Sequence, residues 1–153
     1  MKTKLRGKRQ SIVVIFGVFD LLHKGHISLF KQAKKHGEVV AIVARDSSVL
    51  KIKNRNSHHK ERTRLAAVRR IPEVSKVFLG DKVLGSYSVL KKLKPQTICL
   101  GYDQRTLETD LRVRIKKREL PSIKIIRLKP HKPHKFKTSI VARNIWKEKI
   151  QSN

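Results

Sequence analysis

The stretch from Gly17 to His26 constrains this chain more than any other part of its 153 residues. It reads Gly-Val-Phe-Asp-Leu-Leu-His-Lys-Gly-His, follows the apolar run 12–16, and precedes a helical pattern that starts near Gly25. Backbone N–H groups at a helix N-terminus carry partial positive charge and bind anions. Gly25 has no Cβ atom, so a phosphate can approach its backbone closely. A strand, a tight turn and a helix start in this order therefore predict a phosphate-binding site.

Two histidines, His23 and His26, stand at this predicted helix start. Side chains three or four positions apart lie on the same face of a helix, so both can face one bound group. The alternative interpretation is a structural turn with two solvated histidines. The strand–turn–helix context around the pair favours the phosphate site.

The rest of the chain alternates apolar, β-rich runs with helical patterns. Strands are predicted at 12–16, 38–44, 76–79, 97–100 and 123–128. Helices are predicted at 25–36, 60–70, 85–93, 105–118 and 138–150. The polar stretch 45–59 is expected to be a mobile loop. Strands that alternate with helices of this length form a parallel sheet with right-handed crossovers, so we expect an α/β fold.

One domain is expected at 11–153, preceded by a basic tail at 1–10, because domains cluster near ~100–150 residues. In open parallel sheets, ligands bind beyond the carboxyl ends of the strands. Gly17, Asp46 and Gly101 each follow a predicted strand, so we expect them around a single cleft. The only cysteine, Cys99, lies in a predicted buried strand and cannot form an internal disulfide, which indicates a reducing, cytoplasmic environment.

The chain is strongly basic, with 38 Lys and Arg against 11 Asp and Glu and a net charge of +27. Such a charge attracts polyanions, and nonspecific nucleic-acid binding is expected at low salt. Two interpretations stay open: a specific nucleic-acid partner, or a solvated basic surface typical of the source proteome. No aromatic-rich sheet motif or zinc-ligand spacing marks a known nucleic-acid module. No apolar stretch approaches the ~20 residues that span a membrane, so no membrane partner is expected.

The pattern GxFDxxHxGH at 17–26 resembles the signature of the nucleotidyltransferase superfamily with the HxGH motif. This superfamily includes cytidylyltransferases, adenylyltransferases and archaeal-type FAD synthetases, and the resemblance extends from Val13 to about Trp146. It implies a single Rossmann-like, doubly wound parallel sheet. It also implies transfer of a nucleoside monophosphate from an NTP to a phosphorylated acceptor, with Mg²⁺ carried by the triphosphate and no protein metal site. A homodimer is the assembly that the resemblance suggests.

Two short segments are most similar to the archaeal-type FAD synthetases. They are Val-Ala-Arg-Asp at 43–46 and Gly-Tyr-Asp-Gln at 101–104. They favour transfer of AMP from ATP to FMN, giving FAD and pyrophosphate. One alternative is a different acceptor within the same enzyme class, chiefly glycerol-3-phosphate with CTP, or else phosphopantetheine or a phosphorylated sugar. The other is a non-catalytic nucleotide- or RNA-binding derivative, which the charge favours but which has no need of both histidines.

The resemblance assigns roles to the residues that match the family's motifs. His23 and His26 are expected to stabilise charge on the transferring phosphate. Lys137, Thr138 and Ser139 are expected to hold the β- and γ-phosphates, although Thr and Ser there also fit simple helix capping. Further nucleotide contacts are expected from Val18, Phe19, Lys24, Gly25, Gly101, Asp103 and His131. Acceptor contacts are expected from Asp20, Lys51, Lys53 and Arg62, with Arg64 as the alternative to Arg62.

Overall fold

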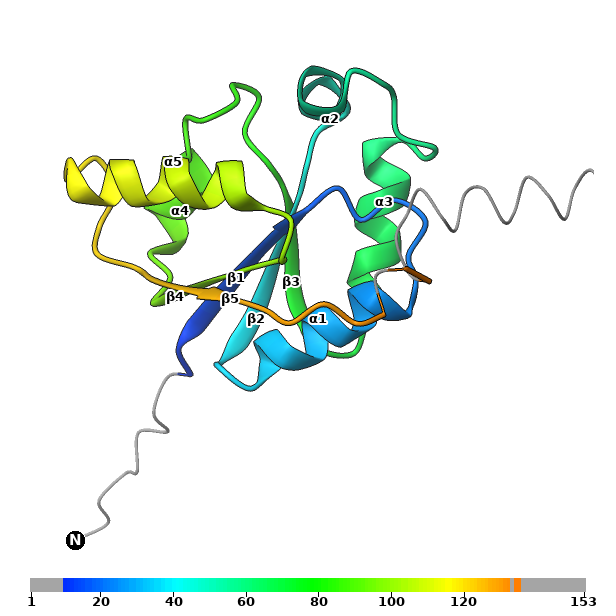
Figure 1. Cartoon of the computed structure of the whole chain (residues 1–153), viewed down its shortest axis with the longest axis horizontal. Helices are drawn as coiled ribbons and strands as arrows, with labels where there is room; N and C mark the ends of the chain where they lie inside the picture. The colour runs from blue at the N-terminus through cyan, green and yellow to red at the C-terminus, as the bar shows by residue number, and fades with distance from the viewer. Residues whose placement is uncertain (1–9, 133, 136–153) are drawn as a thin grey trace, which may run out of the picture.

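The computed structural model describes residues 10–132 and 134–135, in which one or two helices connect each strand to the next. The strands are β1 (Ile12–Gly17), β2 (Glu38–Val43), β3 (Val74–Leu79), β4 (Thr97–Leu100) and β5 (Lys124–Arg127). The helices are α1 (Lys24–Lys34), α2 (Asp46–Lys53), α3 (Glu61–Arg69), α4 (Ser88–Leu93) and α5 (Arg105–Lys116). All neighbouring strands pair in parallel, in the order β3-β2-β1-β4-β5 (Figure 1), which confirms the predicted sheet. Within the described residues, no helix has the length and apolar character needed to cross a membrane.

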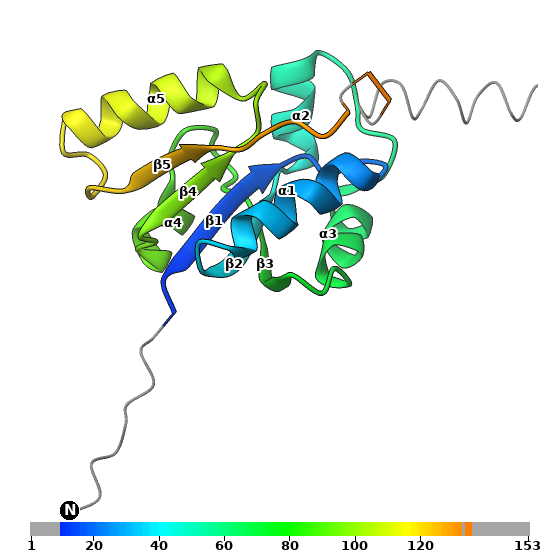
Figure 2. The same ribbon diagram turned by 60° about the horizontal axis from the view of Figure 1, so that its bottom comes forward.

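Helices cover both faces of the sheet (Figure 2). Successive strand residues point to opposite faces, so β1, β2, β4 and β5 each contribute to two hydrophobic cores, whereas the edge strand β3 contributes to one. In β1, Val13 shares one core with Phe30 of α1, and α3 adds to the same core. Val14 shares the other core with Leu90 of α4 and Leu111 of α5. Both faces of the sheet are therefore covered by apolar packing, and the sheet is doubly wound, as predicted.

The strand order creates a switch point between β1 and β4. The chain builds β1, β2 and β3 outward in one direction and then returns to place β4 on the other side of β1. The connections that leave β1 and β4 therefore diverge at their carboxyl ends, which is where open parallel sheets bind ligands. The side chain of Gln104 bridges the two strands there. Its oxygen accepts a hydrogen bond from the Gly101 N–H (2.8 Å) and its amide donates to the Phe16 carbonyl (3.0 Å).

The prediction of a mobile loop over 45–59 is wrong in its first half, because α2 occupies Asp46–Lys53. The helix is short and its sequence is polar, so its apolar periodicity is weak. Tertiary contacts stabilise it instead, through the buried Val49 and a hydrogen bond from the Asp46 N–H to Glu61. It ends where Asn54 adopts a left-handed conformation, with φ of 52°.

Helix α4 begins at Ser88, three residues later than the predicted helix at 85–93. Tyr87 stands before it in a left-handed conformation, with φ of 51°. The carboxylate of Asp81 accepts hydrogen bonds from the N–H groups of Ser88 and Val89, so it caps the helix from outside its own sequence segment. Because Asp81 lies seven residues before Ser88, no local capping pattern in the sequence indicates this cap.

Cys99 lies in β4 and is fully buried, as predicted. Burial raises the pKa of its thiol to about 11, so the thiol is protonated at neutral pH. It packs as a small apolar side chain in the same core as Val13.

The first turn of the histidine motif depends on a glycine. Phe19 has φ of 52°, and its ring folds back over Gly17. The ring is buried and packs against Phe30 and His26, with centroids 5.1 and 5.8 Å apart. A Cβ atom at Gly17 would lie 2.6 Å from the nearest atom of this ring, so it would force the ring to move.

We therefore expect Gly17→Ala to lower the free energy of unfolding by about 1–3 kcal/mol, the usual effect of overpacking a core. Urea unfolding followed by circular dichroism measures this change. Gly80→Ala is the matched control, because a Cβ there meets its nearest atom at 3.5 Å, an ordinary contact. Equal stability of the two variants would contradict this account of the turn.

Candidate active site

A cavity of about 850 Å³ opens at the carboxyl end of the sheet. Its walls come from the segments that follow β1, β2, β3 and β4, and from α2, which lies beyond the strand ends (Figure 1). The switch point between β1 and β4 forms part of its floor, through residues 16–18 and 101–104. The cavity therefore lies where the fold predicts a ligand site.

His23 and His26 form a capping box at the start of α1. Nδ1 of His23 accepts a hydrogen bond from the Gly25 N–H (3.1 Å), and Nδ1 of His26 accepts one from the His23 N–H (3.2 Å). The two rings stack with their centroids 3.9 Å apart, and both line the cavity. Since each Nδ1 is an acceptor, each neutral ring carries its proton on Nε2.

The surroundings keep both rings neutral. Burial lowers the pKa of His23. Burial, followed by the charges of His23 and Lys53, lowers the pKa of His26 to about 3, against an opposing effect of Asp20. A protonated Nδ1 could not accept the capping hydrogen bonds, so the geometry and the pKa shifts agree. At neutral pH the pair supplies two N–H donors and no positive charge.

Positive charge in the cavity comes from Arg45, Lys53 and Arg55. Burial in the cavity wall lowers the pKa of Lys53, and Arg55 lowers it further, while the carboxylates of Asp103 and Asp20 raise it. The start of α1, where Gly25 lines the cavity, adds the partial positive charge of the helix dipole. Neutral donors and nearby cations together suit a polyphosphate ligand.

The structure brings most of the described residues with predicted ligand contacts to this cavity. Those that line it are Val18, Phe19, Asp20, His23, Gly25, His26, Lys53, Gly101, Asp103 and His131. Those that do not line it are Lys24, Lys51 and Arg62, which are exposed. Lys137, Thr138 and Ser139 lie outside the described residues.

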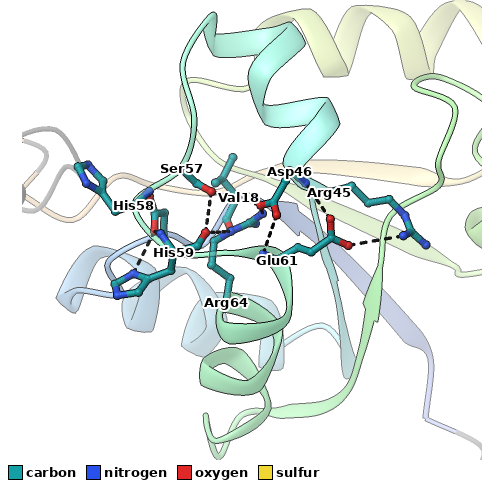
Figure 3. Close-up of polar contacts among 9 residues, drawn as sticks. Val18, Arg45, Asp46, Ser57, His58, His59, Glu61 and Arg64 are labelled. Carbon is teal, nitrogen blue, oxygen red and sulfur yellow. Dashed lines mark hydrogen bonds and ion pairs between the residues drawn. The ribbon is translucent and has the colours of Figure 1, made fainter.

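Asp46, which the sequence placed at the cleft, does not line the cavity and instead joins α2 to α3 (Figure 3). The Asp46 N–H donates to Oε1 of Glu61, and the Glu61 N–H donates to Oδ2 of Asp46. Both donor–acceptor distances are 3.2 Å. Each carboxylate therefore caps the N-terminus of the other helix, where negative charge is also favoured by the helix dipole. Arg45 adds an ion pair with Glu61 at 3.5 Å.

Arg64 lies at the centre of this network and is 1% exposed. Its guanidinium donates to Oδ1 of Asp46 (2.8 Å), to the Val18 carbonyl (2.7 Å) and to the His59 carbonyl (3.0 Å). Figure 3 shows these contacts converging from α2, the motif turn and the loop before α3. Arg64 therefore positions the cavity wall without lining it.

Asp20 of the motif lines the cavity and also holds the loop before α3. Its buried carboxylate accepts hydrogen bonds from the N–H groups of His58 (2.6 Å) and His59 (3.1 Å). The predicted acceptor contact of Asp20 is compatible with its place in the cavity wall, but its hydrogen bonds also give it a structural task.

Sequence reasoning missed the joint role of Asp46, Glu61 and Arg64. Acidic residues in the first turn of two successive helices were the available signal, since they mark helix starts. That each caps the other helix depends on the packing of α2 beside α3, which no local pattern encodes. The apolar residues Ile52 and Leu84 of the cavity wall were missed as well.

Residues 14–150 match the family model described as cytidylyltransferase-like. The chain is 42% identical over 113 residues to FAD synthase from Pyrococcus abyssi, covering 71% of this chain and 76% of that protein. It is 38% identical over 137 residues to FAD synthase from Korarchaeum cryptofilum, covering 87% and 90% of the two chains.

Solved structures give the same fold. The crystal structure of the lipopolysaccharide core biosynthesis protein from Thermoplasma volcanium is 35% identical, with a TM-score of 0.72, and the match covers 80% of this chain and 98% of that one. Pantoate-beta-alanine ligase from Francisella tularensis shares the fold at 18% identity and a TM-score of 0.57, over 90% of this chain and 66% of that one.

We expect Arg64→Met to lower the free energy of unfolding by about 3–5 kcal/mol, because it leaves the partners of a buried charge unsatisfied. Arg62→Met on the same helix is the control, since an exposed arginine usually contributes within about 0.5 kcal/mol. Urea unfolding of both variants measures the difference. A small effect at position 64 would contradict the positioning role.

The lowered histidine pKa values make stability depend on pH. Between pH 6.5 and about 3 the unfolded chain binds more protons than the native one, so stability is lost as the pH falls through this window. We expect His26→Asn, whose side-chain oxygen can replace the Nδ1 acceptor, to reduce the loss between pH 6.5 and 5 by about 1–2 kcal/mol. Urea unfolding at both pH values tests this, and parallel curves for the two proteins would contradict it.

Proposed function

The chain belongs to the cytidylyltransferase-like family of nucleotidyltransferases, and from this premise we propose that it transfers AMP from ATP to FMN, forming FAD and pyrophosphate. Relatives named FAD synthase match it over most of their own length. The observation that carries the proposal is the neutral histidine pair, which caps α1 and lines the cavity at the strand ends.

The reaction begins with in-line attack. An FMN phosphate oxygen forms a bond to the α-phosphorus of ATP, the bond from that phosphorus to the bridging oxygen breaks, and its electrons leave with pyrophosphate. Positioning and charge stabilisation supply most of the catalysis in such a step. The Nε2–H groups of His23 and His26 donate to phosphate oxygens on which negative charge grows in the transition state.

The other cavity residues divide between the two substrates. Gly101 and Asp103 follow β4, His131 follows β5, and these three cavity residues hold the nucleoside part of ATP. Lys53 and Arg55 attract the phosphates of both substrates. Lys137, Thr138 and Ser139 are proposed to hold the β- and γ-phosphates, and the exposed Lys24, Lys51 and Arg62 keep their predicted ligand contacts as proposals.

Mg²⁺ is proposed to enter with ATP and to neutralise charge on the pyrophosphate. Among residues 10–132 and 134–135, no group of three or more His, Cys, Asp or Glu side chains is arranged to hold a metal ion. In the proposed reaction this cation would be held by phosphate oxygens and water, as Mg²⁺ often is.

A pyrophosphate-release assay tests the reaction. It combines ATP or CTP with FMN, glycerol-3-phosphate or phosphopantetheine, with Mg²⁺ and at moderate salt, which suppresses nonspecific binding by the +27 charge. Turnover with ATP and FMN alone supports the proposal. Turnover with CTP and glycerol-3-phosphate keeps the chemistry and changes the substrates, and no turnover in any combination favours a binding protein.

We expect His23→Asn to lower kcat by ~10²-fold or more with little change in stability. Asparagine is as good an N-cap as any residue, so it preserves the hydrogen bond to Gly25, but it has no group in the place of Nε2–H. Steady-state kinetics and urea unfolding of the same preparation measure both effects. His23→Ala removes cap and donor together and is the comparison. Near-normal turnover in His23→Asn and His26→Asn would exclude the catalytic role.

A further inference from the structure

Large apolar side chains lie exposed among the residues that line the cavity. Ile52 of α2 is 63% exposed, and Val83 and Leu84 of the segment between β3 and α4 are 68% and 51% exposed. Apolar side chains that gather in a concave site commonly contact a ligand, because a ligand removes their surface from water. This group, Ile52, Val83 and Leu84, is named the apolar wall below.

The segment that carries Val83 and Leu84 is braced at its base. Nε of Arg45 donates to the Gly80 carbonyl at 2.7 Å. The Asp81 carboxylate accepts from the Ser86 hydroxyl at 2.6 Å and caps α4. Several hydrogen bonds therefore hold the base of a segment whose tip presents apolar side chains to the cavity. Such pre-organisation lowers the entropy lost when a ligand binds.

Charge lies directly beside the apolar wall. Lys53 follows Ile52 on α2, and Arg45 stands at the base of the other segment, and both line the cavity. A ligand that satisfies both features has a broad apolar part joined to a phosphate. FMN has this composition, with its isoalloxazine ring and terminal phosphate. Glycerol-3-phosphate has the phosphate and lacks the apolar part.

The apolar wall and the expected nucleoside site belong to different connections of the sheet. It is built from segments that follow β2 and β3, whereas Gly101, Asp103 and Gln104 follow β4 on the other side of β1. The histidine pair follows β1, between these two groups of strands. In the order of the strands, a phosphate at the histidines would therefore lie between the two groups of residues.

We propose that Ile52, Val83 and Leu84 form the subsite that receives the isoalloxazine ring of FMN. The wall makes the enzyme selective for a phosphate monoester that carries a large flat apolar group. This inference rests on the proposed function, because it assigns the acceptor half of the same cavity.

Ile52→Gln and Leu84→Gln test the wall, alone and combined. Quenching of flavin fluorescence gives the Kd for FMN, and steady-state FAD formation gives KM for FMN and for ATP. Each substitution is expected to raise the Kd and KM for FMN by about 5- to 10-fold, as loss of a partly buried apolar contact does. KM for ATP is expected to stay within about twofold of the value for the unmodified chain, because a substitution that does not touch ATP has a small effect on its binding.

Leu50→Gln is the matched control, because Leu50 lies on the same helix, is 48% exposed and does not line the cavity. Its FMN affinity should equal that of the unmodified chain. Unchanged FMN affinity in the double variant, or a rise in KM for ATP instead, overturns the subsite and leaves FAD formation intact.

The two proposals fail in different ways. If the unmodified chain binds FMN without forming FAD, the proposed reaction falls, and the Kd values of the variants still decide the subsite. If the unmodified chain does not quench FMN fluorescence, with or without a non-hydrolysable ATP analogue, the subsite is overturned.

Discussion

The buried guanidinium of Arg64 is the interaction on which the site depends. A desolvated charge must keep its partners, so the segments that supply them are held at fixed distances from one another. These partners are the Val18 carbonyl in the motif turn, Asp46 at the start of α2 and the His59 carbonyl before α3. On the other side of β1, Gln104 ties the β4 end to β1 in the same manner. The cavity lies between these two ties.

In this site, hydrogen-bond donation and positive charge come from different residues. The histidines are desolvated, stacked and committed to helix capping, which keeps them neutral. The cations stand farther along the chain, on α2 and in the segment that follows it, where Lys53 and Arg55 line the cavity. Neutral donors fixed at the helix start do not reorient as water molecules do. Electrostatic catalysis requires donors whose orientation is set before the reaction.

Local sequence signals predicted the strands, the doubly wound sheet and the histidine site, because alternating apolar runs and the motif report on short segments. They failed at α2, whose stability comes from Val49 and Glu61 rather than from its own periodicity. They also failed at Asp46, which follows a strand but faces Arg64. Its direction is set by the packing of α2 beside α3, which no local pattern encodes.

The histidine capping box has a consequence for the proton balance of ligand binding. Many anion sites built on histidine take up a proton when the anion arrives, so their affinity weakens as the pH rises. Here each Nδ1 already accepts a backbone hydrogen bond and each Nε2 already carries a proton. Neither ring therefore has a nitrogen left to take up another proton in the neutral range. In the proposed reaction, nucleotide would therefore enter and pyrophosphate would leave without these rings gaining or losing protons across the neutral range.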